Sequence, residues 1–444
     1  MASLDDVRSL VQKHWGFDSF RPLQEQAIRC VLERRDSLVV LPTGGGKSLC
    51  YQAPALAIGG ATVVVSPLIS LMKDQVDSLK ACGVPAVQFD SSLSSMEREV
   101  HKFDILQGNV RLIFVSPERI VFEGFRDMLR RAEVKTFAID EAHCISHWGH
   151  DFRPEYRQIG ELRRLFPDAS FHGYTATATE QVRADICKQL GLQNPAVLVG
   201  NFDRPNLSYR ILPRTDPAKQ ILDVLDRHKK EAGIIYTLRR AEVDDYAEWL
   251  QKKGFRCVAY HAGLTADERR AAQDAFAAEK VDVVVATVAF GMGIDRSNIR
   301  FVLHANMPKS VEHYQQETGR AGRDGLEADC VLLYSAGDTM TWKKILQKSA
   351  EENQVDPDFL PNALKHLDDM DRYCRSAQCR HRALVNYFGQ DYDRSNCGAC
   401  DQCLGDTEVV PDSLVLAQKI LSCVARTGES HSRSMIASPT CPAA

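Results

Sequence analysis

The sequence predicts an α/β protein with two tandem parallel-sheet domains and a smaller helical region after them. Short apolar stretches alternate with longer helical segments twice along the 444 residues, and this alternation is typical of parallel sheets covered by helices on both faces. The length suffices for two or three domains of ~100–200 residues. Strand-like stretches stop near residue 348, so a helical region is expected beyond it.

The expected strands are the short apolar stretches, which lie at 37–41, 61–66, 112–115 and 136–139 in the first domain and at 233–237, 257–261, 281–287, 301–304 and 330–334 in the second. Segment 201–217 carries three prolines and no strong periodicity, which predicts the domain linker. The chain then divides into a first domain, a second domain, a helical subdomain and a remainder, at 1–205, 206–345, 346–408 and 409–444.

Composition excludes several classes of protein. The hydrophobic share of 44% and charged share of 26% are typical of a globular chain and not of a disordered one. No apolar run approaches the ~18 residues of a membrane span, and the N-terminus lacks a secretory signal, so we expect an intracellular protein. The net charge of −4 means that any nucleic-acid site must be a local basic patch.

A glycine-rich loop follows the first expected strand, and residues able to start a helix follow the loop. Consecutive glycines let backbone N–H groups turn toward phosphates, a lysine reaches the β- and γ-phosphates, and a serine hydroxyl binds Mg²⁺. The strict pattern has a further glycine where this chain carries Leu41. The alternative is a turn without a ligand. This candidate phosphate loop consists of Pro42, Thr43, Gly44, Gly45, Gly46, Lys47 and Ser48.

Two acidic residues, Asp140 and Glu141, follow the expected strand at 136–139. A carboxylate at this end of a parallel strand lies beside the phosphate loop, so Asp140 is expected to hold Mg²⁺ and Glu141 to orient or deprotonate the attacking water. The alternative is a solvated acidic turn. Together with Lys47 and Ser48, the pair predicts hydrolysis of ATP or GTP.

The second domain carries no phosphate loop, but it contains Arg320 and Arg323, three positions apart and on one face if the segment is helical. Guanidinium groups stabilise charge on a transferring γ-phosphate and raise its rate of transfer by ~10³–10⁵-fold. The alternative is a surface pair of arginines in salt bridges. Because the phosphate loop has no other cationic partner in the sequence, we favour the catalytic interpretation.

Aromatic and basic residues alternate in segment 144–156, directly after Glu141. Aromatic rings stack on unpaired bases at ~1–3 kcal/mol per base, and interleaved arginines contact phosphates without reading sequence. A loop of this kind can sense single-stranded DNA and report to the carboxylates. The alternative is that its aromatic side chains belong to the core. The residues expected to contact DNA are His147, Trp148, Phe152 and Arg153.

Four cysteines, Cys379, Cys397, Cys400 and Cys403, follow a C-x17-C-x2-C-x2-C pattern. Four thiolates suit a closed tetrahedral Zn²⁺ site that stabilises a small subdomain. An iron–sulfur cluster is the alternative, although the Cys-Pro expected after a ferredoxin pattern is missing. Cys374 is interpreted as a helix residue and not as a ligand.

These motifs resemble the RecQ family of superfamily two DNA helicases over about residues 11–404. By this resemblance Trp15, Arg21 and Gln24 belong to a motif that contacts adenine, and the nucleotide site extends to Gln316. Segment 64–75, with Ser66 and Pro67, resembles the motif that grips the DNA backbone. Segment 175–178 resembles the motif that couples hydrolysis to strand separation. Segment 286–295, which contains Thr287, resembles the second-domain motif that touches both DNA and nucleotide. The resemblance also makes Arg323 the better candidate for an arginine finger. It implies that the phosphate loop needs no glycine at position 41, and the four cysteines match the family's zinc subdomain.

The resemblance implies two RecA-like domains and an ATP-dependent DNA helicase that moves 3'-to-5' in recombination, repair and replication. It implies ATP, Mg²⁺ and Zn²⁺ as cofactors and single-stranded and forked DNA as partners, with single-strand-binding protein and other repair factors as further partners. A cytoplasmic location at the nucleoid follows. Rival functions are a translocase or annealing factor that unwinds weakly and a binding scaffold with a silent ATPase, and RNA is a rival substrate.

The C-terminus departs from the family pattern. Only segment 415–428 resembles the first helix of the winged-helix domain that binds duplex DNA in the family, and 431–444 reads as a frayed tail. We therefore expect an incomplete duplex-binding region.

Overall fold

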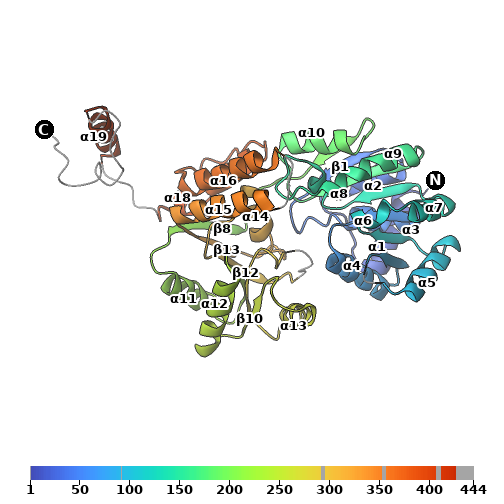
Figure 1. Ribbon diagram of the computed structural model, residues 1–444, viewed down its shortest axis with the longest axis horizontal. Helices are drawn as coiled ribbons and strands as arrows, with labels where there is room; N and C mark the ends of the chain where they lie inside the picture. The colour runs from blue at the N-terminus through green and yellow to red at the C-terminus, as the bar shows by residue number, and fades with distance from the viewer. Residues whose placement is uncertain (1, 92, 292–295, 353–356, 407–411, 427–444) are drawn as a thin grey trace.

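The computed structural model describes residues 2–91, 93–291, 296–352, 357–406 and 412–426. Two α/β lobes lie side by side, and a group of helices that follows the second lobe also reaches the first (Figure 1). The predicted fold class, with two parallel sheets and a helical region after them, is confirmed. Within these described ranges, no helix is both long and apolar enough to cross a membrane.

The first sheet is parallel throughout, with strand order β3-β4-β2-β5-β6-β1-β7. Its central strands are buried on both faces, as expected for a sheet covered by helices on both sides. β6 lies between β1 and β5, so the carboxyl ends of β1 and β5 meet at one edge. The strands are β1 (Ser37–Val40), β2 (Thr62–Val65), β3 (Ala86–Phe89), β4 (Leu112–Val115), β5 (Thr136–Ile139), β6 (Ser170–Thr175) and β7 (Ala196–Val199).

Helices cover this sheet and connect its strands (Figure 1). α1 begins with a capping box at Ser3, and α5 begins with another at Ser94, each of which satisfies backbone N–H groups of the first turn. The helices are α1 (Leu4–Trp15), α2 (Gln24–Leu32), α3 (Leu49–Ala57), α4 (Ile69–Ala81), α5 (Ser95–Leu106), α6 (Pro117–Ile120), α7 (Glu123–Arg131), η1 (Ala142–Ile145), α8 (Pro154–Arg157), η2 (Gln158–Glu161), α9 (Leu162–Leu165) and α10 (Glu180–Gln189).

The second sheet is also parallel, with strand order β10-β11-β9-β12-β13-β8. Its strands are β8 (Leu207–Pro213), β9 (Ala232–Tyr236), β10 (Cys257–Tyr260), β11 (Val283–Ala286), β12 (Ile299–His304) and β13 (Ala328–Tyr334). Its helices are α11 (Pro217–Arg227), α12 (Arg240–Lys252), α13 (Ala266–Ala277), α14 (Val311–Thr318) and α15 (Ala336–Glu352). The predicted boundary at 345/346 falls inside α15.

The predicted linker at 201–217 extends too far, because β8 (Leu207–Pro213) lies within it. This strand pairs with β13 over its whole length and forms the edge of the second sheet. Its residues alternate between buried and partly exposed, a period of two that the nearby prolines obscured. The connection between the sheets is therefore confined to residues 200–206.

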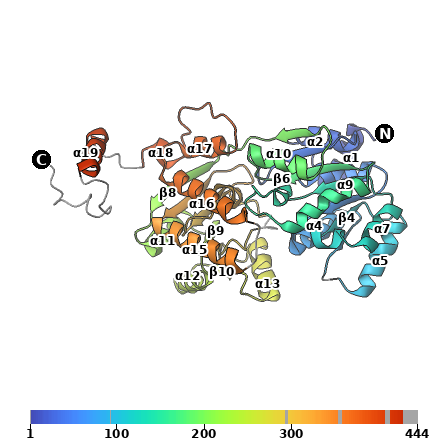
Figure 2. The same ribbon diagram turned by 45° about the horizontal axis from the view of Figure 1, so that its top comes forward.

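The last helices pack against both lobes. α16 (Phe359–Arg375) and α17 (Arg380–Tyr387) lie next to α10 of the first lobe (Figures 1 and 2), where Arg183 donates to the carbonyl of Phe388 at 3.3 Å. α18 (Asp401–Leu404) lies at β8. The expected helix near 411–426 is present as α19 (Ser413–Arg426), whose relation to a winged helix stays a prediction. The tail at 431–444 lies outside the described residues.

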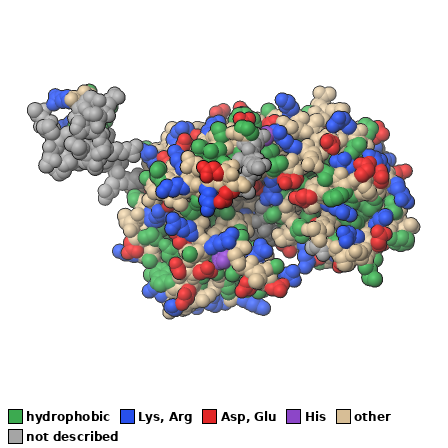
Figure 3. All heavy atoms as spheres, viewed as in Figure 1, with side chains coloured by type: hydrophobic (Ala, Val, Ile, Leu, Met, Phe, Trp, Pro, Cys, Tyr) green, Lys and Arg blue, Asp and Glu red, His purple; other side chains and the backbone are tan. Residues whose placement is uncertain are grey.

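Charged residues of both signs are interspersed over the surface seen in Figure 3. This distribution accords with the small net charge of −4.

Candidate active site and zinc centre

The candidate phosphate loop connects β1 to α3 and takes a shape that glycine favours. Gly44 and Gly46 have positive φ angles of 82° and 74°. A Cβ atom on Gly45 would lie 2.9 Å from the carbonyl oxygen of Pro42. Lys47 folds back over the loop, where its Nζ donates to the carbonyl of Leu41 at 3.0 Å. A turn of this shape is compatible with the predicted phosphate loop, whose ligand stays a prediction.

Two of the residues assigned to adenine recognition hold this loop. Gln24 Nε2 donates to the carbonyl of Gly46 at 3.0 Å, and its Oε1 accepts from the backbone N–H of Arg21 at 2.7 Å. The Arg21 guanidinium donates to the carbonyl of Gly44. Trp15 is partly buried against the helices behind the loop. The contacts of these three residues with a base stay a prediction.

Asp140 and Glu141 lie at the carboxyl end of β5, beside the phosphate loop. Burial, followed by the charge of Glu141, raises the pKa of Asp140. Burial lowers the pKa of Lys47, an effect that both carboxylates oppose. The charges of the lysine and the two carboxylates are therefore close enough to influence one another, while a catalytic role for the three residues stays a prediction.

Glu141 has two features typical of a functional residue. Its φ angle of 47° places a non-glycine residue in the left-handed region, which costs energy that the surrounding structure must supply. Its buried Oε2 has no hydrogen-bond partner and lies 3.3 Å from Nδ1 of His143, within ion-pair range only. This oxygen is placed to accept a proton or a hydrogen bond from a water molecule.

The residues present fit a magnesium–nucleotide complex. Asp140 and Ser48 supply the hard oxygen ligands that Mg²⁺ prefers, and the loop supplies backbone N–H groups for the phosphates. Bound Mg²⁺ would offset the charge of the phosphates and of Asp140.

Arg320 and Arg323 do not share a helix face. α14 ends at Thr318, and both arginines follow in successive turns that we call the arginine loop, residues 319–323. A Cβ atom on Gly44 would lie 3.5 Å from Cγ of Arg323, and one on Gly319 would lie 3.1 Å from Cβ of Thr43. The arginine loop of the second lobe therefore touches the phosphate loop of the first.

The electrostatics of the site support the same geometry. The charge of Arg323 is close enough to lower the pKa of Lys47 further. Arg320 is only 5% exposed, and its Nε has no hydrogen-bond partner. Gln316 is half-buried on α14, and its contact with nucleotide stays a prediction.

Arg204, which no sequence motif singled out, joins the two halves of the site. Its guanidinium donates to the carbonyl of Thr43 in the first lobe at 3.4 Å. It also donates to the carbonyls of Gly319 at 3.4 Å, Ala321 at 3.0 Å and Gly322 at 2.9 Å in the second lobe. An arginine of the connecting segment thus fixes the spacing of the phosphate and arginine loops.

Replacing Arg204 by alanine is expected to lower kcat for ATP hydrolysis roughly 10²-fold with little change in KM, because small misplacements of reacting groups are this costly. Steady-state hydrolysis at saturating DNA measures it. The matched control is Arg227→Ala, which removes an exposed arginine at the end of α11 that is paired with Asp329 of β13. An unchanged kcat, or a loss of thermal stability that accounts for the whole effect, would contradict this role.

The aromatic loop, residues 146–153, follows η1, and most of its residues are partly exposed. Trp148 is 39% exposed, so the alternative that it is a core residue is wrong. His147 and Phe152 stack with ring centroids 4.1 Å apart. Arg153 donates to the carbonyl of Pro67 at 3.1 Å, which brings the loop against the predicted backbone-gripping segment. Contacts of these residues with DNA stay predictions.

The remaining predicted DNA and coupling residues lie at strand ends. Ser66 follows β2, and its buried Oγ has no hydrogen-bond partner. Thr175 ends β6, and its hydroxyl hydrogen-bonds Nδ1 of His143 at 2.9 Å, next to Glu141. Thr287 follows β11, and its backbone N–H donates to Tyr260 at 3.2 Å. Residues 292–295 of the predicted motif lie outside the described part of the chain.

The four predicted zinc ligands come together. Their sulfur atoms lie within 4.8 Å of one another, a spacing that suits a tetrahedral ion with Zn–S bonds of ~2.3 Å. Backbone N–H groups of Ala399 and Cys403 donate to the sulfurs of Cys397 and Cys400 at 3.3 and 3.4 Å, which favours thiolates. Cys374 is buried in the core and does not belong to the cluster, as predicted.

A second set of contacts ties the cysteine cluster to the edge of the second sheet. Arg380 and Asp401 form a buried ion pair at 2.8 Å, and Asp401 accepts from the backbone N–H of Ile211 in β8 at 3.0 Å. The N–H of Tyr209 donates to the carbonyl of Ala399 at 3.0 Å. The zinc cluster is therefore built onto β8.

Three family models match the chain: DEAD/DEAH box helicase over residues 21–185, helicase conserved C-terminal domain over 216–325 and RecQ zinc-binding over 336–404. Among solved structures, Mycobacterium smegmatis helicase Lhr bound to ssDNA and AMP-PNP has a TM-score of 0.60 at 19% identity, over 79% of this chain and 50% of that one. This likeness concerns the fold. The paired lobes and the site between them define a helicase-type nucleoside triphosphatase.

Curated relatives narrow this class. The ATP-dependent DNA helicase RecQ of Pasteurella multocida is 46% identical over 415 residues, which are 94% of this chain and 65% of that protein. The ATP-dependent DNA helicase RecQ of Bacillus subtilis is 43% identical over 436 residues, 98% of this chain and 73% of that protein. The chain belongs to the RecQ family.

Proposed function

We propose that this protein couples ATP hydrolysis to 3'-to-5' movement along single-stranded DNA and to strand separation, in DNA repair, recombination and replication. The observation that carries the proposal is the packing of Arg323 from the second lobe against Gly44 of the phosphate loop, beside Lys47 and the two carboxylates. The named activity of its RecQ relatives supports the choice of DNA as substrate. Forked DNA at the chromosome is the proposed working site, with single-strand-binding protein as a candidate partner.

Each group of the site has a role in the proposed reaction. The loop and Lys47 would bind the β- and γ-phosphates, and Asp140 with Ser48 would hold Mg²⁺. Glu141 orients the attacking water and accepts its proton, while Arg323 stabilises charge on the transferring phosphoryl group. Because the arginine comes from the other lobe, the site is complete only when the lobes are together. Nucleotide binding and release therefore change how the lobes sit on the strand.

Replacing Lys47 by alanine tests the proposal. We expect ATP hydrolysis to fall on the order of 10²–10³-fold, because the developing charge on the phosphates loses a fixed cation. Phosphate release with single-stranded DNA measures turnover, and a forked duplex measures unwinding. Lys280→Ala, at an exposed position remote from the loop, is the matched control. Normal turnover by the Lys47 variant would refute the site, and a wild type that hydrolyses ATP without unwinding would refute strand separation.

A further inference from the structure

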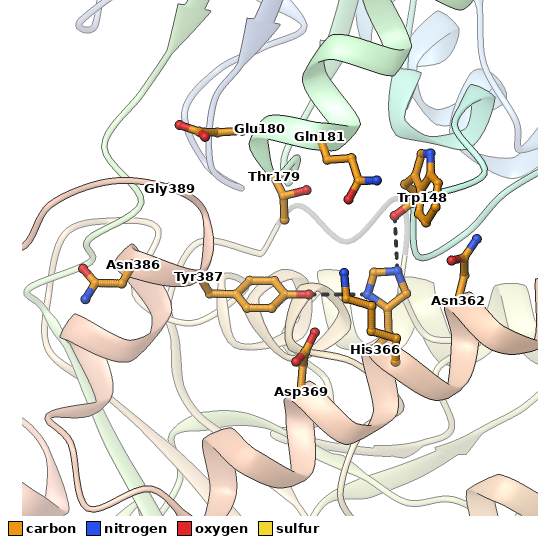
Figure 4. Close-up of a pocket in the computed structure, with 11 residues that line it drawn as sticks. Trp148, Thr179, Glu180, Gln181, Asn362, His366, Asp369, Asn386, Tyr387 and Gly389 are labelled. Carbon is orange, nitrogen blue, oxygen red and sulfur yellow. Dashed lines mark hydrogen bonds between the residues drawn. The ribbon is translucent and has the colours of Figure 1, made fainter.

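Helix α16 of the zinc-binding region holds the backbone of the aromatic loop (Figure 4). His366 Nε2 hydrogen-bonds the carbonyl of Trp148 at 3.2 Å, and Asn362 Nδ2 donates to the carbonyl of His147 at 3.3 Å. Both contacts are to backbone oxygens, and the Trp148 indole stays 39% exposed. The helix thus fixes the position of the loop while leaving the ring available for stacking.

The other side of the His366 ring faces α14. Its Nδ1 lies 3.4 Å from Oε1 of Glu312, a residue of α14 that is 2% exposed. Tyr387 donates to the same carboxylate oxygen at 2.7 Å. Burial opposes the charge on His366, but the Glu312 carboxylate outweighs it, so the pKa of His366 is raised above its usual value. The Glu312 carboxylate therefore favours the charged form of the partly buried His366 ring that it contacts.

α14 leads directly into the arginine loop. Glu312 lies in its first turn, and Arg320 and Arg323 follow its last residue, Thr318. A second contact joins the aromatic loop to the same helix, because the rings of His150 and His313 lie 4.6 Å apart. The aromatic loop and the catalytic arginines thus lie at opposite ends of one continuous set of packed groups.

We propose that His366 is a positioning residue that couples occupancy of the aromatic loop by single-stranded DNA to the arginine loop, through Glu312 and α14. The zinc-binding region then takes part in DNA-stimulated hydrolysis, in addition to its structural role. This inference rests on the proposed function, because it concerns regulation of the same hydrolytic site. DNA binding to the aromatic loop and placement of the arginine loop at the nucleotide are then two coupled equilibria. Removing the contact between His366 and Glu312 should uncouple them.

The test uses the full chain with His366→Ala and Glu312→Gln, singly and together. Hydrolysis is measured with and without an unstructured single-stranded oligonucleotide, and oligonucleotide affinity is measured by fluorescence anisotropy. We expect each single variant to keep basal hydrolysis and DNA affinity within about twofold, while stimulation at saturating DNA falls at least ~5-fold. The double variant should lose no more than either single variant, because both residues belong to one link.

The controls separate coupling from folding. Asn386→Ala alters a residue that lines a cavity together with Trp148 and His366 (Figure 4) but whose side chain forms no hydrogen bond to the aromatic loop, and it should behave as wild type. Trp148→Ala should abolish the stimulation of hydrolysis by DNA, because it removes the ring proposed to stack on DNA. His366→Gln keeps a donor for the Trp148 carbonyl and should recover part of the stimulation even if the alanine variant folds poorly.

Two results would overturn the inference. One is full stimulation of the His366→Ala and Glu312→Gln variants, and the other is a proportional loss of basal and stimulated rates, which is the mark of a structural role. Failure of the proposed function is distinguishable, because it would show as absent DNA-stimulated hydrolysis in the wild type.

Discussion

Replacing Arg323 by alanine is expected to lower the maximal rate of ATP hydrolysis by ~10³-fold or more, the range found for arginine fingers. The arginine packs against Gly44, where the transferring phosphoryl group would lie next to Lys47. Its charge counts most in the transition state, so kcat should fall while KM for ATP changes little. Steady-state hydrolysis at saturating single-stranded DNA separates the two constants.

Two further variants define the role of this arginine. Arg323→Lys keeps the charge but not the planar fork, so it should recover only part of the rate. Arg256→Ala removes an arginine whose partner is Asp282 on the far side of the second lobe, and it should leave the rate unchanged. A fall of less than tenfold in the Arg323→Ala variant would mean that another cation, with Arg320 the nearest candidate, stabilises the γ-phosphate.

The layout of the fold followed from hydrophobic patterning, but several strands did not. β6 was not predicted because several of its residues, Ser170–Thr175, are polar, although the structure buries all of them. The polar groups are satisfied inside the sheet, where His172 hydrogen-bonds Ser37 on β1 at 2.8 Å. β8 escaped because prolines lie at and beyond its end, where a parallel edge strand tolerates them. Hydrophobic patterning indicates the average environment of a residue, but it does not indicate which hydrogen-bond partner a buried polar side chain will have.

Part of the candidate site could likewise be predicted from the sequence and part could not. The phosphate loop, the two carboxylates and the cysteines were predictable because their chemistry needs particular side chains at particular spacings. Arg204 and His366 were not, because they act on backbone carbonyls, which any residue type supplies. Arg320 and Arg323 would share a face only in a helix, but α14 ends at Thr318 and Gly322, with a φ angle of 57°, turns the chain between the two arginines. Contacts between lobes depend on the assembled fold, and local sequence does not encode them.

Removing zinc is expected to destabilise the second lobe as well as the cysteine cluster. The cluster is joined to β8 through the Tyr209–Ala399 and Ile211–Asp401 hydrogen bonds, and β8 closes the second sheet. Without the ion, the thiolates repel one another, and the surroundings that keep the Arg380–Asp401 ion pair buried are disrupted. We expect chelation, or Cys400→Ser, to lower the thermal unfolding midpoint by about 10 °C or more, which corresponds to several kcal/mol for a lobe of this size.

Metal content decides what this loss means. The wild type should hold one zinc ion per chain by elemental analysis, and Cys400→Ser should hold less, whereas Cys374→Ser should keep its zinc because Cys374 lies in the core and not in the cluster. Iron with visible charge-transfer absorption would instead support the iron–sulfur alternative. A metal-free variant that keeps its unfolding midpoint would show that β8 is held by packing alone. Because both hydrogen bonds to β8 come from residues beside Cys400, we expect metal loss and lobe destabilisation to occur together.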